Sequence, residues 1–182
     1  EKVCKIWIEQ FNYQLCMKTR SPRIHAICLF SGGLDSILSI RLLQLQEIEV
    51  HPIMFQSLFF CSRLPEDDKA PLNLPVQMEE FTPTLIAIIN KPKHGFGSGM
   101  NPCIDCHTAM LRHAGEIMVE KGYNFISTGE VLNQRPMSQN RRALNLVAKE
   151  SGYNGLILRP LSAKCLEETL PEQQGWIERE KL

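Results

Sequence analysis

Hydrophobic positions along the chain alternate between the spacing of strands and that of helices. Short apolar runs at 25–30 and 49–55 predict buried strands, and the residues between them, 35–47, have apolar side chains at helical spacing. A strand, a helix and a second strand in this order predict a parallel unit with a right-handed crossover. Pro52 removes one backbone donor from the second strand, so we expect a bulge or local irregularity there.

The same alternation continues to the end of the chain. It predicts strands at 76–79, 123–127 and 155–159, helices at 83–90, 103–121 and 138–151, and a helical tail. About five strands alternating with helices predict a three-layer α/β fold with a mainly parallel sheet. We expect an N-terminal helix within residues 1–20 and a single domain over residues 21–182. Ligands of such sheets bind beyond the carboxyl ends of the strands.

The composition is that of a globular protein. Of the 182 residues, 43% are hydrophobic and 22% are charged, and the net charge of zero gives no argument for a nucleic-acid partner. No apolar run approaches the ~18–20 residues that span a bilayer, and no signal peptide opens the sequence, so we expect a cytoplasmic protein with no membrane partner. The seven cysteines, an odd number, then favour thiol or metal chemistry over disulfides.

The segment Ser31–Ser36, with the sequence SGGLDS, follows the first predicted strand and opens the first predicted helix. A glycine-rich turn at this place forms an anion site, because the free N–H groups and the dipole of the helix both point at the turn. Gly32 and Gly33 allow a positive φ and the close approach of a phosphate. Ser31 and Ser36 add hydroxyl donors, and Asp35 adds a carboxylate ligand for Mg²⁺.

The sequence NPCIDCH at residues 101–107 is a second candidate site, because it opens another predicted helix. Cys103 and Cys106 there face the free N–H groups of the helix, which we expect to lower the pKa of the thiols and favour thiolates. Thiolates are the form that a metal ion, an iron–sulfur cluster or a sulfur-transfer step requires.

Two cysteines are too few ligands for either metal centre, since zinc takes four ligands and an iron–sulfur cluster at least three from the protein. His107 and Asp105 are adjacent to the pair, and Cys61 and Cys165 are the remaining candidate thiols. Cys165 follows the carboxyl end of the last predicted strand and can therefore reach the same crevice. We favour Cys165 as the third metal ligand, beside Cys103 and Cys106.

These motifs resemble those of the PP-loop ATP pyrophosphatases, and within that superfamily the tRNA thiouridine synthases. The resemblance covers residues 25–172 approximately. It rests on five segments of the sequence: 31–36, 92–95, 101–107, 128–139 and 158–164. It implies the variant of the α/β fold found in adenine-nucleotide α-hydrolases, with residues 21–182 as the ATP-binding domain.

The resemblance also implies roles for individual residues. ATP would lie on Ser31–Ser36 with its adenine near Met54 and Phe55, while Thr128 and Gly129 would close over the ribose and the α-phosphate. The enzyme would adenylate a tRNA uridine carbonyl and replace the oxygen with sulfur. Pyrophosphate would leave with the help of Mg²⁺ on Asp35.

In this family the sulfur is held by a three-cysteine 4Fe–4S cluster or by a persulfide, which here would use Cys103 and Cys106. A sulfur-donor protein or free sulfide would supply it. Arg135, Arg141 and Arg142 are candidates for contacts with tRNA phosphates. A homodimer would enlarge this modest basic face.

Two other functions fit the same motifs. One is a PP-loop ligase that forms amides or nitriles and carries structural zinc in place of the cluster. The other is a nucleotide-binding module whose catalysis depends on a partner. Release of pyrophosphate by the isolated chain would separate the module from the two enzymes, and the bound metal would separate the enzymes from each other.

Overall fold

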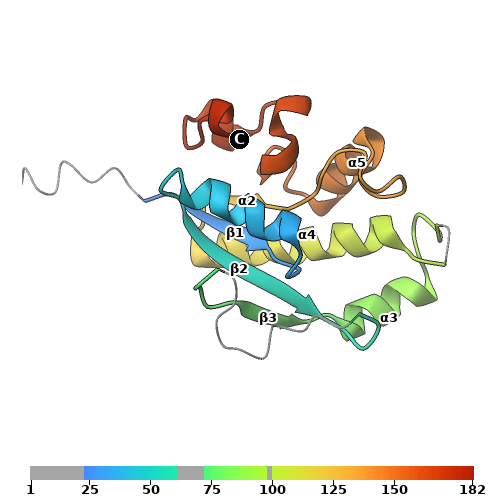
Figure 1. The fold of residues 1–182 in the computed structure, drawn as a ribbon. Helices are drawn as coiled ribbons and strands as arrows, with labels where there is room; N and C mark the ends of the chain where they lie inside the picture. Colours follow the sequence, from blue (N-terminus) through green and yellow to red (C-terminus); the bar gives the residue numbers. More distant parts are fainter. Residues whose placement is uncertain (1–22, 61–71, 98–99) are drawn as a thin grey trace, which may run out of the picture.

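The computed structural model describes residues 23–60, 72–97 and 100–182 (Figure 1). Within these residues the centre is a five-stranded parallel sheet with the order β3-β2-β1-β4-β5. The strands are β1 (His25–Leu29), β2 (Glu49–Gln56), β3 (Gln77–Glu80), β4 (Phe125–Ser127) and β5 (Ile157–Leu158). The predicted α/β fold with a parallel sheet is therefore confirmed. The helix predicted within residues 1–20 lies outside the described residues.

Helices cover both faces of the sheet and complete the three layers. On one face α2 (Leu34–Gln44) packs with η1 (Pro160–Cys165), and the short elements α6 (Leu170–Gln173) and η2 (Arg179–Lys181) complete the predicted tail. On the other face lie α3 (Thr82–Asn90), α4 (Cys103–Lys121) and α5 (Arg141–Ser151). Alternate residues of β1 feed the two cores: Ile27 packs on the α4 side, and Ala26 and Cys28 pack on the α2 side.

The expected irregularity at Pro52 is wrong, because β2 pairs with β1 in unbroken register from Glu49 to Ile53. The carbonyl of Ile53 accepts from Phe30 N–H, so Ile53 faces β1 and the nitrogen of its neighbour Pro52 faces the other way. On that side β3 pairs with β2 only from Ile53 onward. The missing N–H of Pro52 thus removes no ladder hydrogen bond.

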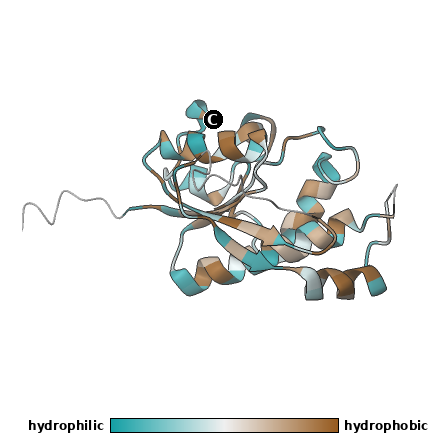
Figure 2. Ribbon diagram, turned by 60° about the horizontal axis from the view of Figure 1, so that its bottom comes forward, coloured by the Kyte–Doolittle hydropathy of each residue, from teal (hydrophilic) through white to brown (hydrophobic). Residues whose placement is uncertain are grey.

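The helix α3 carries an apolar stretch at residues 85–89 (Figure 2). Leu85 is buried in the core beside α4, and Ile88 and Ile89 pack against that core, whereas Ile86 is 43% exposed. Within the described part of the chain, no helix is long and apolar enough to cross a membrane.

Candidate active site

A cavity of about 520 Å³ lies at the carboxyl ends of β1, β2 and β4. This volume is within the usual range for small-molecule sites. The residues proposed from the sequence that line it are Ser31, Gly33, Asp35, Ser36, Phe55, Cys106, His107, Thr128, Gly129 and Arg135. The structure thus brings the glycine-rich loop and one cysteine of the pair to the same cavity.

The loop at Ser31–Ser36 turns from β1 into α2 through Gly32, whose φ of +78° favours glycine. Ser36 Oγ donates to the carbonyl oxygen of Gly33 at 2.7 Å, which ties the turn to the first turn of α2. Gly33 occupies the N-cap position, where no described side chain caps the helix. The first backbone N–H groups of α2 therefore remain available to an anion such as a phosphate.

Gly129, just after β4, packs directly against this loop. A Cβ at this position would lie 2.7 Å from the backbone nitrogen of Ser36 and 2.9 Å from the carbonyl carbon of Asp35. Only glycine fits, since the atoms in contact belong to the backbone. The close packing joins the loops that follow β1 and β4.

The carboxylate of Asp35 lines the cavity and accepts from Gln134 Nε2 at 3.1 Å. Carboxylate oxygens are ligands that Mg²⁺ takes together with substrate phosphates. Asp35 therefore has the position and the chemistry to hold Mg²⁺ beside a phosphate bound at the loop.

A buried ion pair supports the floor of the cavity. Glu130, only 7% exposed, accepts from Arg159 Nε at 2.9 Å and from the Thr128 hydroxyl at 3.1 Å, and its Oε1 lies 3.1 Å from His107 Nδ1. Burial alone would raise the pKa of this carboxyl. The hydrogen bond from His107 and the charge of Arg159 outweigh it and lower the pKa to about 2. Glu130 is thus ionised and holds His107 toward the cavity.

The cysteine pair occupies the first turn of α4, where Cys106 lines the cavity and Cys103 does not. Burial, with a smaller contribution from Cys103, raises the pKa of Cys106 to about 11. The expectation that the helix N-terminus favours a thiolate is therefore wrong for Cys106. Metal coordination would reverse this, because a bound metal ion deprotonates a thiol.

The proposed third ligand, Cys165, is an exposed residue at the end of η1, and its backbone carbonyl accepts from Arg141 Nη2 at 2.7 Å. Among the described residues, no set of three ligand atoms within 4.8 Å of one another includes Cys103, Cys106 or Cys165. Asp105, next to Cys106 in the sequence, is bound to His94, whose Nδ1 lies 2.6 Å from its Oδ1. A three-cysteine cluster therefore does not fit the described residues as they stand.

Met54 also lies away from the cavity. Its side chain is buried in the core on the α2 side, whereas Phe55 points to the α4 side and lines the cavity. Adjacent residues of a strand face opposite sides of the sheet, so only one of the two can reach the cavity. Of the two residues predicted to lie near adenine, only Phe55 therefore lines the cavity.

Three polar cavity residues were not proposed from the sequence as site residues: Glu130, Gln134 and Gln139. Gln139 is 6% exposed, and its Oε1 is buried without a hydrogen-bond partner among the described residues. An unpaired acceptor on a cavity wall fits a ligand that donates a hydrogen bond. The motif at 128–139 contains all three of these residues, so the resemblance was the signal that could have identified them.

No family model matches the sequence. The chain is 30% identical over 156 residues to a tRNA sulfurtransferase of Desulfurococcus amylolyticus, a match that covers 80% of this chain and 31% of that protein. It therefore spans about a third of the length of this relative.

Two solved structures share the fold. One is a predicted subunit of a tRNA methyltransferase from Methanocaldococcus jannaschii, with a TM-score of 0.51, 17% identity and coverage of 76% of this chain and 68% of that one. The other is a 4-thiouridine synthetase in complex with RNA and bound ATP, with a TM-score of 0.54, 22% identity and coverage of 75% and 36%. The resemblance to tRNA sulfurtransferases that the motifs indicate is thus confirmed by a relative of that name, and the two solved structures show the same fold.

Proposed function

We propose that this protein is an ATP-dependent tRNA sulfurtransferase, which adenylates a uridine carbonyl and replaces its oxygen with sulfur. One observation carries the proposal: a single cavity is lined both by the anion-binding loop at Ser31–Ser36 and by Cys106. A nucleotide activated on the loop would be formed within reach of the sulfur that must displace AMP. The 4-thiouridine synthetase with the same fold was solved with RNA and ATP.

ATP is the substrate that the loop suits best. The N–H groups at the start of α2 and the hydroxyls of Ser31 and Ser36 would bind its phosphates, and Phe55 would contact the adenine. Mg²⁺ held by Asp35 would neutralise charge on the departing pyrophosphate. Attack of the uridine oxygen on the α-phosphorus breaks the bond to the β-phosphate and turns a poor leaving group into AMP.

The cysteine pair would deliver the sulfur. A donor of sulfane sulfur first converts Cys106 to a persulfide, whose terminal sulfur attacks the adenylated carbon while AMP leaves with the carbon–oxygen electron pair. Cys103, three residues earlier in the same helical turn, then attacks the inner sulfur of Cys106. The thiouridine leaves, and a disulfide remains that a dithiol reductant returns to thiols.

The cofactors of the reaction follow from the donors on the cavity wall. Asp35 fits Mg²⁺. A 4Fe–4S cluster needs a third ligand that the described residues do not place beside Cys103 and Cys106, so no step is assigned to it here. Iron and sulfide in the anaerobic protein remain the measurement that decides between a cluster and a persulfide.

tRNA and a sulfur donor are the proposed partners. Arg135 lines the cavity and can meet a nucleotide there, whereas Arg141 and Arg142 are exposed at the start of α5. The net charge of zero adds no general attraction for tRNA. Either a second copy of the chain or an additional segment would enlarge the surface that holds the tRNA.

The test is a complete reaction with unmodified tRNA, ATP, Mg²⁺ and a sulfur donor. We expect AMP, pyrophosphate and thiouridine in equal amounts, with thiouridine identified by mass spectrometry of the digested tRNA. Asp35→Asn, which keeps the shape of the side chain, should lose all three products. Cys106→Ala should lose thiouridine and AMP but still release pyrophosphate, because AMP leaves only when the sulfur attacks. Thiouridine formed at the normal rate by Cys106→Ala would contradict the proposal.

A nucleotide-binding module is a second candidate function, favoured by the fact that the chain spans only 31% of its curated relative. In that case the chain alone binds ATP but forms neither AMP nor pyrophosphate until a partner is added. The complete reaction, with tRNA and donor but no partner protein, distinguishes the two functions: the enzyme releases pyrophosphate in it, and the module alone does not.

A further inference from the structure

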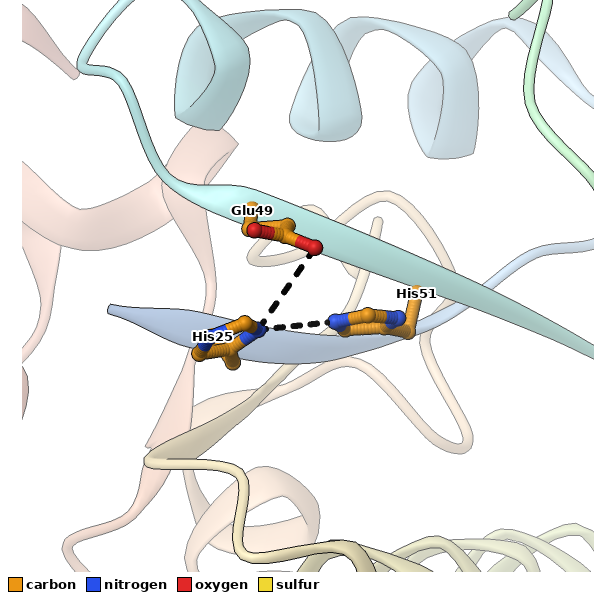
Figure 3. A group of neighbouring side chains, drawn as sticks. All are labelled: His25, Glu49 and His51. Atoms are coloured by element: carbon orange, nitrogen blue, oxygen red, sulfur yellow. Dashed lines mark hydrogen bonds and ion pairs between the residues drawn. The ribbon is translucent and has the colours of Figure 1, made fainter. Parts of the chain in front are cut away.

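A second cluster of metal-ligating side chains lies at the amino end of the sheet, opposite to the cavity. His25 opens β1, and Glu49, which opens β2, lies beside it in the register. His51 follows two residues later on β2, so all three side chains project from the same face of the sheet (Figure 3). The proposed sulfur transfer uses none of them.

The ligand atoms of this His–Glu–His cluster converge. His25 Nδ1 lies 3.1 Å from His51 Nε2 and 3.9 Å from Glu49 Oε1, and the three atoms all lie within 4.8 Å of one another. Nitrogen and oxygen ligands about 2.1 Å from a tetrahedral zinc ion lie ~3.4 Å apart. The two observed distances fall on either side of that value, so shifts of a few tenths of an ångström suffice to bind an ion.

Neighbouring residues hold both imidazoles in place. The ring of Tyr123 stacks on His51 with centroids 4.0 Å apart and planes 7° apart. Asn124 pairs with the backbone of His25, accepting from its N–H at 2.8 Å and donating to its carbonyl at 2.8 Å. Arg23 contacts the Oε2 atom of Glu49 at 3.5 Å, which leaves Oε1 as the oxygen nearest His25.

We propose that His25, Glu49 and His51 bind a divalent transition-metal cation, with zinc as the best match. Two imidazoles and one carboxylate are a donor set typical of zinc, and the open fourth position would take water. The side chains of His25 and Glu49 are 31% and 43% exposed, so the ion can enter from solvent. The metal would tie the first residues of β1 to those of β2.

The test is calorimetric titration with Zn²⁺ of the whole chain carrying Cys103→Ser and Cys106→Ser, because thiols are themselves zinc ligands. We expect one equivalent of zinc. His25→Ala and His51→Ala should each weaken its binding roughly tenfold or more. His113→Ala is the matched control, since His113 also pairs with a glutamate, Glu79, at 2.8 Å and lies outside the cluster.

Melting curves without and with Zn²⁺ show whether the variants fold and whether bound metal raises the melting temperature. Glu49→Gln keeps the size of the side chain and provides the test if a histidine variant fails to fold; it should also weaken zinc binding. The proposal is overturned if the parent binds no zinc. It is equally overturned if folded His25→Ala and His51→Ala bind zinc as tightly as His113→Ala does.

Discussion

The loop at Ser31–Ser36 and the cysteine turn at Cys103–Cys106 both sit at the start of a helix and both reach the same cavity, yet they differ in chemistry. At the start of α2 the N-cap is Gly33, and the backbone N–H groups themselves are the functional groups. At the start of α4 the functional groups are side chains. A helix N-terminus is therefore ready to bind an anion through its backbone, whereas its effect on a side chain depends on burial.

The numbers for Cys106 show which effect is larger. A helix terminus favours a negative charge by ~0.3–1 kcal/mol at exposed positions. Raising the pKa of Cys106 from 9.0 to about 11 corresponds to ~3 kcal/mol against the thiolate. Burial outweighs the dipole, so the loop is ready to act as it stands and the cysteine turn needs a sulfur donor or a metal.

Removing both thiols should have the largest effect, because it abolishes the chemistry of the cysteine turn and leaves that of the loop. In Cys103→Ala/Cys106→Ala we expect thiouridine formation to fall to background, while ATP-dependent release of pyrophosphate persists because the loop is unchanged. The measurement is both products in parallel. Loss of pyrophosphate release as well would show that the two sides do not act independently.

Metal analysis of the same variant identifies what the thiols hold. Iron and acid-labile sulfide in the anaerobic parent, absent from the double variant, would establish a cluster. Zinc that the double variant loses would favour the ligase, and no metal lost in the double variant would leave the persulfide. Cys165→Ala and Cys61→Ala, compared for iron content, test the third ligand. Full iron in Cys165→Ala would exclude the ligand that we favour from the sequence.

Glu130→Gln should lower the free energy of unfolding by ~3–5 kcal/mol, because it leaves Arg159 buried without its counter-ion.

The pKa of about 2 for Glu130 also predicts how stability changes with pH. The folded carboxyl has a lower pKa than its ordinary 4.5, so its contribution, ~3 kcal/mol, is present above pH ~4.5 and is lost as the pH falls toward 2. Urea unfolding between pH 2 and 7 should show a loss of stability that is larger in the parent than in Glu130→Gln by about this amount, because other carboxyls with lowered pKa values titrate in both.

The matched control is Glu172→Gln, which breaks the 2.6 Å ion pair with Arg179 in the C-terminal segment. Both variants lose an ion pair, but of the two glutamates only Glu130 lines the cavity, where it also contacts His107. We therefore expect ATP turnover to fall in Glu130→Gln and to stay at the parent level in Glu172→Gln. Equal turnover in both would mean that Glu130 only stabilises the fold.

Local patterns were enough to predict the sheet and the loop from the sequence. Strand and helix spacing are set by neighbours in the chain, and Ser31–Ser36 needs only its own glycines and the helix that follows it. Contacts over long separations were not accessible. Glu130 and Arg159 are 29 residues apart in the sequence, so no local pattern pairs them. That they form a buried ion pair is seen only in the folded structure.

The cavity wall shows the same limit at single residues. Strand alternation says that Met54 and Phe55 face opposite sides, but not which side α4 covers. The pKa of Cys106 was predicted with the wrong sign, because the sequence gives the helix start and not the burial. The predicted start of a helix was wrong where a side chain caps it. The helix α5 begins at Arg141 and not at the predicted 138, because Asn140 caps it by accepting from Ala143 N–H at 2.9 Å.

Gly129→Ala should disturb the loop side alone. The new Cβ would press on the backbone of Asp35 and Ser36 at under 3 Å, and overpacking of this kind costs ~1–3 kcal/mol. We expect a lower melting temperature and weaker ATP binding, with metal or persulfide content on the cysteines unchanged. In Gly33→Ala, where φ is −79° and the nearest atom is 3.4 Å from the Cβ, the melting temperature should hold. An equal drop in melting temperature in both variants would mean that the contact of Gly129 with the loop is not the cause of the drop.

Gln139→Leu should give the smallest and most specific effect. The Oε1 atom of Gln139 has no partner among the described residues, so replacing it with a similar apolar side chain removes a buried unpaired acceptor and should leave stability unchanged or slightly raised. If ATP donates to this atom, its affinity should fall roughly two- to tenfold, the loss of one hydrogen bond. Measured by titration with a non-hydrolysable ATP analogue, an unchanged affinity would assign Gln139 to the acceptor nucleotide, and a weaker affinity with unchanged stability would place it on the loop side.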